Sequence, residues 1–317
     1  MALSKEVELK QFPKVFADLA YASDSPEQKL DIFLPEDGEG PYPLVVLVHG
    51  GGWIAGGRRE ECVSCVFKII SQGYALATVD YRLAPGSIWP AQIYDVKTAI
   101  RFLRAHRDEY HINTDKIVVW CNSAGAHISN VLAATGGRDI LENKRMGYPQ
   151  ESSAIQGLIS WYGVFDLPSQ DADMTETSGQ ECHANGSSMK CPPCMEVGYI
   201  IEGNPRSAEA ASCSPYMTPD YPPTLIQHGK KDCIVSWKQS QKFYDKITEL
   251  CGEGRAILEY MDEANHGDPL FKTDENTDRC LDFLDSIYFP EGDRPSPRTP
   301  LPAIHCVEVT EKSGPQE

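Results

Sequence analysis

Ser123 lies between a strand-like segment and a helix-like segment. Residues 117–121 before it are apolar, and small residues that favour a helix follow it. An apolar run of this length is typical of a buried parallel strand. A sharp strand-to-helix turn at a serine holds the hydroxyl at the carboxyl edge of a sheet, where it can act as a nucleophile. Because so short a motif recurs by chance, this prediction depends on an oxyanion site, an acid and a base elsewhere in the chain.

The segment that could hold an oxyanion lies upstream. Residues 43–48 read as a buried strand and run into His49-Gly50-Gly51-Gly52-Trp53. Glycines let the backbone approach a ligand closely and direct N–H groups at it. In hydrolases with such a loop, its N–H groups act together with the N–H of the residue after the nucleophile. We therefore expect Gly51, Gly52 and Ala124 to form an oxyanion hole.

The glycine run also fits part of a dinucleotide-binding pattern. Gly50, Gly52 and Ala55 match G-x-G-x-x-A, and Asp80 ends the next apolar run, where a ribose-binding acid would stand. Bulky residues follow the glycines at the place where a pyrophosphate would approach. This interpretation also leaves Ser123 without a role, so we favour the oxyanion site.

An acid and a base follow in the remaining sequence. Asp232 stands just past the strand-like residues 223–229, and His266 stands in the loop after residues 256–261. Taken alone, Asp232 could be a turn or cap residue, and His266 a surface loop residue. Their order after Ser123, each just past a strand, is the order of nucleophile, acid and base in α/β-hydrolases.

Three other histidines near these segments are expected to have supporting roles. His127 stands four residues after Ser123 on the same expected helix and reads as structural. His228 precedes a turn glycine and is expected to support the acid loop. His49 is expected to orient the glycine loop.

Taken together, these residues resemble the feruloyl and acetyl esterase-like group of the α/β-hydrolase superfamily, near the hormone-sensitive-lipase-like esterases. The resemblance covers about residues 15 to 288. It implies that Ser123 is the nucleophile, Asp232 the acid and His266 the base of a catalytic triad. The matching segments are His49 to Trp53, Asp80 to Pro85, Trp89 to Lys97, Ser123 to Gly125, Ser214-Pro215, His228 to Asp232 and His266 to Pro269.

Cys121 departs from that family pattern. The sharp strand-to-helix turn around the nucleophile, called the elbow below, normally has the sequence G-x-S-x-G. This chain reads C-x-S-x-G, residues 121–125. The first glycine lets strand and helix cross closely. Cysteine is small and suited to burial, so we expect Cys121 to fit with a slight shift and to point into the sheet rather than into a cleft.

Strand-like and helix-like segments alternate from residue 43 to 288 without a linker. This pattern predicts one α/β domain, residues 1–288, with a doubly wound and mainly parallel sheet. Residues 14–35 are expected to add two antiparallel edge strands. The Pro-rich tail, residues 289–317, is expected to be extended over the surface or disordered. Helices are expected at 59–72, 91–106, 124–135, 236–250 and 273–286.

A polar insertion, residues 167–200, follows the strand-like residues 157–162. Long loops in compact domains tend to be functional, and the family resemblance implies a cap over the nucleophile. The alternative is a solvated excursion. Trp53, Trp89 and Trp161 are candidates to line the substrate pockets, with a core position as the alternative for each.

The insertion also contains a cluster of possible metal ligands. Cys182, His183, Cys191 and Cys194 could bind a structural zinc ion, form one disulfide between two of the cysteines, or remain unliganded. Structural zinc sites usually show two paired knuckles rather than one, which disfavours zinc. The three expected catalytic residues need no metal and no cofactor.

The net charge of −17 excludes several partners. Such a charge repels nucleic acid and anionic membrane surfaces. No apolar run approaches the ~20 residues that span a bilayer, and the first residues lack the apolar core of a signal peptide. We therefore expect a cytoplasmic protein without nucleic-acid or membrane partners, and a homo-oligomer is left open.

These features predict a serine carboxylic-ester hydrolase that acts through an acyl-enzyme. The resemblance implies small esters with short or aromatic acyl groups, of acetyl or feruloyl type, some of them on sugars. One alternative is an amide hydrolase similar to kynurenine formamidase. A second is a non-catalytic binding protein, disfavoured because all three triad residues are present. An acyltransferase, in which an alcohol replaces water, is the third.

Overall fold

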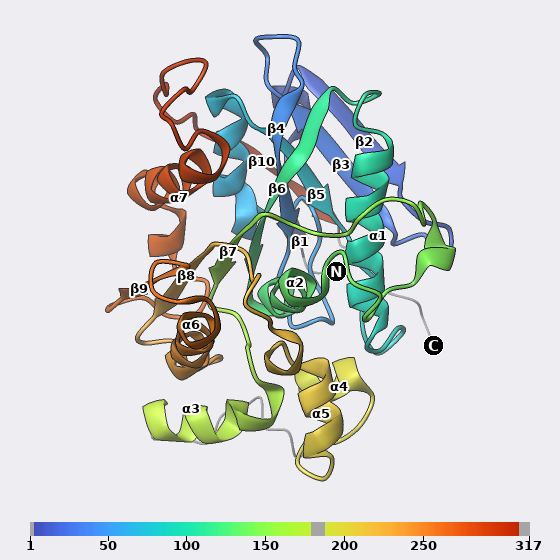
Figure 1. Cartoon of the computed structure of the whole chain (residues 1–317), viewed down its shortest axis with the longest axis vertical. Helices are drawn as coiled ribbons and strands as arrows, with labels where there is room; N and C mark the ends of the chain where they lie inside the picture. Colours follow the sequence, from blue (N-terminus) through green and yellow to red (C-terminus); the bar gives the residue numbers. More distant parts are fainter. Residues whose placement is uncertain (1–2, 179–187, 311–317) are drawn as a thin grey trace.

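The computed structural model describes residues 3–178 and 188–310. An eight-stranded sheet runs through its centre in the order β2-β3-β5-β4-β6-β7-β8-β9 (Figure 1). β3 is antiparallel to both neighbours, and every pair from β5 to β9 is parallel. The strands are β2 (Lys14–Ala20), β3 (Lys29–Leu34), β4 (Tyr42–Val48), β5 (Ala75–Val79), β6 (Ile112–Asn122), β7 (Gly157–Trp161), β8 (Thr224–Gly229) and β9 (Ala256–Met261).

Helices cover both faces of this sheet (Figure 1). One face carries α1 (Ala91–Ala105), α2 (Ser123–Thr135) and α6 (Trp237–Cys251). The other carries α7 (Asp274–Tyr288) and η2 (Glu61–Gln72), a 3₁₀ helix of 12 residues. The predicted doubly wound, mainly parallel α/β sheet and its five helices are therefore confirmed. The remaining short 3₁₀ helices are η1 (Leu9–Gln11), η3 (Lys144–Met146), η4 (Leu167–Ser169), η5 (Ser214–Tyr216) and η6 (Pro269–Lys272).

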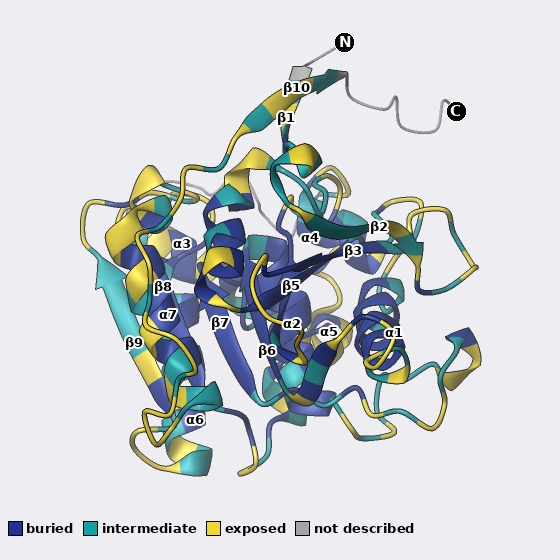
Figure 2. Cartoon of the chain, turned by 90° about the horizontal axis from the view of Figure 1, so that it is seen from above, coloured by how far each residue is buried: buried dark blue, intermediate teal, exposed yellow. Residues whose placement is uncertain are grey.

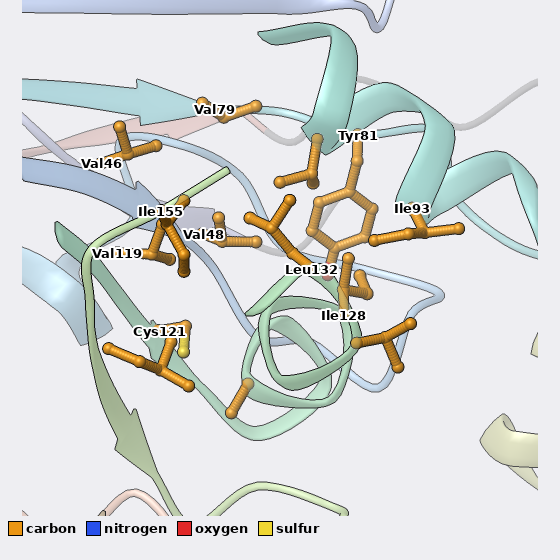
Figure 3. Close-up of a cluster of buried hydrophobic side chains, with 14 of the residues drawn as sticks. Val46, Val48, Val79, Tyr81, Ile93, Val119, Cys121, Ile128, Leu132 and Ile155 are labelled. Carbon is orange, nitrogen blue, oxygen red and sulfur yellow. The ribbon is translucent and has the colours of Figure 1, made fainter. Parts of the chain in front are cut away.

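The apolar strands supply two separate cores because their side chains alternate between the faces. In β6, Ile117, Val119 and Cys121 pack towards α1 and α2, whereas Val118 and Trp120 pack towards η2 and α7. Figure 3 shows the first of these clusters, where Val119 and Cys121 lie on the same side as residues of α2. Burial on both faces explains why the central strands read as continuous apolar runs.

Between β7 and β8, the described residues form three α-helices. α3 (Gln170–Ser178), α4 (Pro192–Val197) and α5 (Pro205–Ala211) lie together at one end of the molecule, beyond α2 (Figure 1). α4 and α5 each begin with a proline, whose fixed φ favours the first helical position. Among the described residues, no helix is both long and apolar enough to cross a bilayer.

The two ends of the described chain pair with each other. β1 (Leu3–Val7) and β10 (Cys306–Thr310) form an antiparallel ribbon that projects from the body (Figure 2). Before β10, the tail runs over the surface, where Arg294 and Arg298 pair with Asp285 of α7. The sequence pattern did not predict β1 or β10, because a two-stranded ribbon depends on a partner about 300 residues away.

Candidate active site

Ser123 occupies a strained turn between β6 and α2. Its φ of 51° lies in the left-handed region, which is uncommon for residues other than glycine. Gly125, two residues later, permits the turn, because a Cβ there would come within 2.3 Å of the carbonyl oxygens of Val48 and His49. Ser123 thus begins α2 at the carboxyl edge of the sheet, as the motif predicted.

Cys121 does not disturb this turn. Its side chain is fully buried, and its Sγ donates to the carbonyl oxygen of Ile159 at 3.2 Å. Burial raises the pKa of the Cys121 thiol to about 12. The expectation that Cys121 points into the sheet is confirmed (Figure 3).

His266 lies between Ser123 and Asp232. Its Nε2 is 2.9 Å from Ser123 Oγ, and its Nδ1 is 2.7 Å from Asp232 Oδ2. An ionised carboxylate only accepts, so Nδ1–H donates to Asp232, and Nε2 is left to accept from the Ser123 hydroxyl. The loops after β6, β8 and β9 bring the three predicted residues together because parallel strands end at one edge.

Asp232 is held as an anion inside the protein. Its Oδ1 accepts from the N–H groups of Ile234 and Val235, both at 2.8 Å. Burial by itself raises the pKa of Asp232, but hydrogen bonds from His228 and His266 outweigh it and hold the pKa well below its usual range.

His228 supports the acid loop, as the sequence indicated. Its Nε2 is 3.2 Å from Asp232 Oδ2 and 2.9 Å from the carbonyl oxygen of Val235. Its Nδ1 is 2.7 Å from the Ser240 hydroxyl. Two acceptors at Nε2 require a proton there, so the Ser240 hydroxyl donates to Nδ1.

The glycine loop lies beside the elbow. Gly51 and Gly52 have φ values of 109° and 60°, and the Gly51 carbonyl accepts from the N–H groups of Ile54 and Ala55. A Cβ on Gly51 would lie 2.0 Å from the Ala55 carbonyl oxygen, so only glycine fits. Ala124 stands in the first turn of α2, where N–H groups have no acceptor within the helix.

His49 and His127 hold this region rather than reaching Ser123. His49 stacks on Tyr81 with ring centroids 4.5 Å apart, and its Nδ1 is 2.7 Å from the Gly50 carbonyl oxygen. His127 is fully buried, and its Nε2 is 2.8 Å from the Ala211 carbonyl oxygen at the end of α5. Burial lowers the pKa of His127 to about 4, so it is neutral at neutral pH.

The three candidate tryptophans lie in different surroundings. Trp161 is only 1% exposed and packs edge-on against Trp120 in the core beside η2 and α7. Alternation along β7 directs it to that face, so Trp161 has the core position that was one of its two predicted alternatives. Trp53 is 3% exposed and donates its indole N–H to His127 Nδ1 at 3.2 Å. Trp89 is half-buried and stays a candidate.

Two residues that the sequence did not single out adjoin the site. Asn122 precedes Ser123 and accepts the Gly50 N–H, and Tyr162 follows β7 with its ring against His266. The sequence feature that could have identified them is their position at or just past the ends of two neighbouring strands. Tyr162 has a φ of 39°, a strained conformation that sequence patterns do not reveal.

The predicted metal cluster is only partly described. Cys182 and His183 lie outside the described residues. In α4, the Cys191 Sγ accepts from the Cys194 N–H at 3.4 Å. No group of three or more candidate metal ligands occurs within residues 3–178 and 188–310. The zinc, disulfide and unliganded alternatives stay predictions.

The chain is similar to a known family and to proteins named as esterases. The BD-FAE family model matches residues 30–247. Esterase LipQ of Mycobacterium tuberculosis (strain ATCC 25618 / H37Rv) is 28% identical over 86% of this chain and 62% of its own length. Esterase LipC of the same strain is 28% identical over 77% and 58%. The chain therefore spans about three fifths of these relatives.

A solved structure shows the same fold. It is described as a truncated form of a carbohydrate esterase from gut microbiota, and it covers 89% of this chain and 98% of its own with a TM-score of 0.77 and 24% identity. The family match spans most of the chain, and the strand order agrees with it. The chain belongs to the BD-FAE family and has the α/β-hydrolase fold.

Proposed function

We propose that this protein is a serine carboxylic-ester hydrolase with Ser123 as nucleophile, His266 as base and Asp232 as acid. The observation that carries the proposal is the continuous path from Ser123 Oγ to His266 Nε2 at 2.9 Å and from His266 Nδ1 to Asp232 Oδ2 at 2.7 Å. A nucleophile with an oriented base in hydrogen-bond reach is the arrangement that acyl transfer requires.

In this mechanism, Ser123 Oγ attacks the ester carbonyl carbon while its proton passes to His266 Nε2. Asp232 fixes the imidazole tautomer and stabilises the imidazolium. The N–H groups of Gly51, Gly52 and Ala124 hold the oxyanion. His266 then protonates the leaving alcohol, and a water molecule, deprotonated by His266, cleaves the acyl-enzyme to acid and free Ser123.

We further propose that the insertion caps the site and limits the acyl group to short or aromatic types. A Cβ at Gly52 would lie 3.4 Å from Pro192 Cβ, so the start of α4 closes over the glycine loop. Sugar esters are the substrate class suggested by the solved relatives, one described as a carbohydrate esterase and another as an acetyl ester-xyloside bifunctional hydrolase.

The test is hydrolysis of p-nitrophenyl esters from C2 to C12 by the wild type, Ser123→Ala and the exposed control Ser286→Ala. We expect activity on short chains, a loss on the order of 10⁴–10⁶-fold in Ser123→Ala, and no change in the control. No hydrolysis by a folded wild type, or equal hydrolysis by Ser123→Ala, would contradict the proposal.

The natural substrate is tested separately with acetylated xylosides, a feruloyl ester and N-formylkynurenine. A kcat/KM highest for the sugar acetates or the feruloyl ester supports the proposed class. A preference for N-formylkynurenine would contradict ester hydrolysis as the natural reaction. It would support amide hydrolysis by the same three residues instead.

A further inference from the structure

Asn122 connects the nucleophile to the glycine loop. It is the last residue of β6, directly before Ser123, and only 6% of it is exposed. Its Oδ1 accepts the N–H of Gly50 at 3.0 Å. The contact is tight, since a Cβ on Gly50 would lie 2.8 Å from Asn122 Nδ2. One side chain thus sets the distance between the elbow and the first glycine of the loop.

The same side chain also reaches Tyr162. Burial raises the pKa of the Tyr162 hydroxyl, and hydrogen bonding from the Asn122 side chain offsets part of that rise. Because Oδ1 accepts from Gly50, the Nδ2 amide is the group that faces the Tyr162 hydroxyl as donor. This contact follows from the sheet register. Asn122 pairs with Trp161 across β6 and β7, so Tyr162 stands one residue beyond, at the same carboxyl edge.

Tyr162 in turn holds His266. Its ring meets the imidazole edge-on, with centroids 4.7 Å apart and planes at 63°, and its other side packs on Phe271 at 4.6 Å. Its own backbone is fixed, because its N–H donates to the Gln227 carbonyl at 2.8 Å. Tyr162 is 4% exposed and has a φ of 39°, so surrounding contacts must maintain this conformation.

We propose that Asn122 and Tyr162 are positioning residues that join Ser123, the glycine loop and His266 into one unit. The inference rests on the proposed function and deepens it. His266 stands on the loop between β9 and η6, with one hydrogen bond to Asp232 and one to Ser123, and the imidazole could still swing about the axis through them. The ring of Tyr162 blocks that swing, and Asn122 ties Tyr162 to the elbow. Misplacing a catalytic group by about 1 Å can cost about 10²-fold in rate.

The test compares Tyr162→Phe, Tyr162→Leu, Asn122→Ala and the double variant Asn122→Ala/Tyr162→Phe on p-nitrophenyl acetate. Tyr162→Phe keeps the ring and loses the hydroxyl, so we expect kcat to fall about 3- to 10-fold with KM within about two-fold. Tyr162→Leu removes the ring, and kcat should fall by about 10². Because the two residues act through one hydrogen bond, the double variant should lose no more than Asn122→Ala alone.

The matched control is Asn130→Ala, which removes another buried asparagine of the same region, bonded to Ser160 at 3.1 Å. It should lower the thermal midpoint without lowering kcat. The inference would be overturned if the loss of kcat in the double variant equalled the product of the two single losses. A Tyr162→Leu variant that lowers only the thermal midpoint of unfolding, with kcat unchanged, would overturn it as well. An inactive wild type would instead contradict the proposed function, so the two failures are distinguishable.

Discussion

The elbow keeps only the second of the two glycines of the usual motif. Gly125 provides the close crossing of α2 over β4, since a Cβ there would lie 2.3 Å from two backbone oxygens. Cys121 takes the place of the other glycine, yet its side chain fills space in the core beside α2. With its thiol pKa raised to about 12 by burial, Cys121 holds no thiolate at neutral pH and is not a nucleophile.

We therefore predict that Cys121→Ala keeps the proposed esterase activity within about two-fold of the wild type. The variant loses a buried sulfur and its hydrogen bond to Ile159, which should lower the free energy of unfolding by about 1–2 kcal/mol. Urea unfolding and steady-state kinetics check both effects. Cys280→Ala, equally buried on the other face of the sheet, is the control. An inactive but folded Cys121→Ala would show that the thiol takes part in the reaction.

At the scale of an element, helix α4 carries Glu196, an acid that is buried where the helix packs on the domain. Both carboxyl oxygens of Glu196 are buried without a hydrogen-bond partner among the described residues. The Oε1 atom is 3.6 Å from His127 Nδ1, which already accepts the Trp53 indole N–H. His127 is thus neutral there and offers no charge to pair with, and burial raises the pKa of Glu196 well above its usual range.

This raised pKa makes the stability of the protein depend on pH. Below the unfolded-state pKa of about 4.3, Glu196 is protonated in both the folded and the unfolded state. Its contribution to the free energy of unfolding is then fully present. As the pH rises, the unfolded chain releases the proton while the folded protein retains it, so stability is lost up to and through the folded-state pKa. We predict that Glu196→Gln has a thermal midpoint close to that of the wild type at pH 4.5 and at least about 3 °C higher at pH 8.

Glu202→Gln, which changes an exposed acid between α4 and α5, is the matched control and should show no such pH-dependent difference. Scanning calorimetry between pH 4.5 and 8 measures the difference between each variant and the wild type. A constant difference for Glu196→Gln across that range would contradict a neutral Glu196 in the folded protein.

At the scale of the whole molecule, the net charge of −17 surrounds the site with a negative field. Such a field lowers the local concentration of anionic substrates and leaves neutral ones unaffected. Salt weakens it, because the Debye length falls from about 30 Å at 0.01 M to about 8 Å at 0.15 M.

We predict that raising the ionic strength over that range increases kcat/KM for the anionic ester 4-acetoxybenzoate by about 2- to 10-fold. For neutral p-nitrophenyl acetate, kcat/KM should stay within about 1.5-fold, which controls for salt effects on the protein itself. Equal responses of the two esters would mean that local charges at the site, rather than the overall field, govern access.

The sequence by itself determined the central strands, the flanking helices and the order of Ser123, Asp232 and His266. These features depend on neighbouring residues: apolar runs specify buried strands, and a serine, acid or histidine directly past a parallel strand must stand at the carboxyl edge. The sequence therefore predicts that the three side chains lie together. The structure adds the distances, 2.9 Å from His266 Nε2 to Ser123 Oγ and 2.7 Å from His266 Nδ1 to Asp232 Oδ2.

The tertiary structure alone decided which side of the sheet Trp161 faces, that Asn122 faces Tyr162, and that Glu196 is buried against a neutral His127. It also decided that β1 pairs with β10. Each of these depends on strand register or on packing between segments far apart in the chain. Local sequence patterns carry no record of such contacts, because the same short segment can be packed against many different partners.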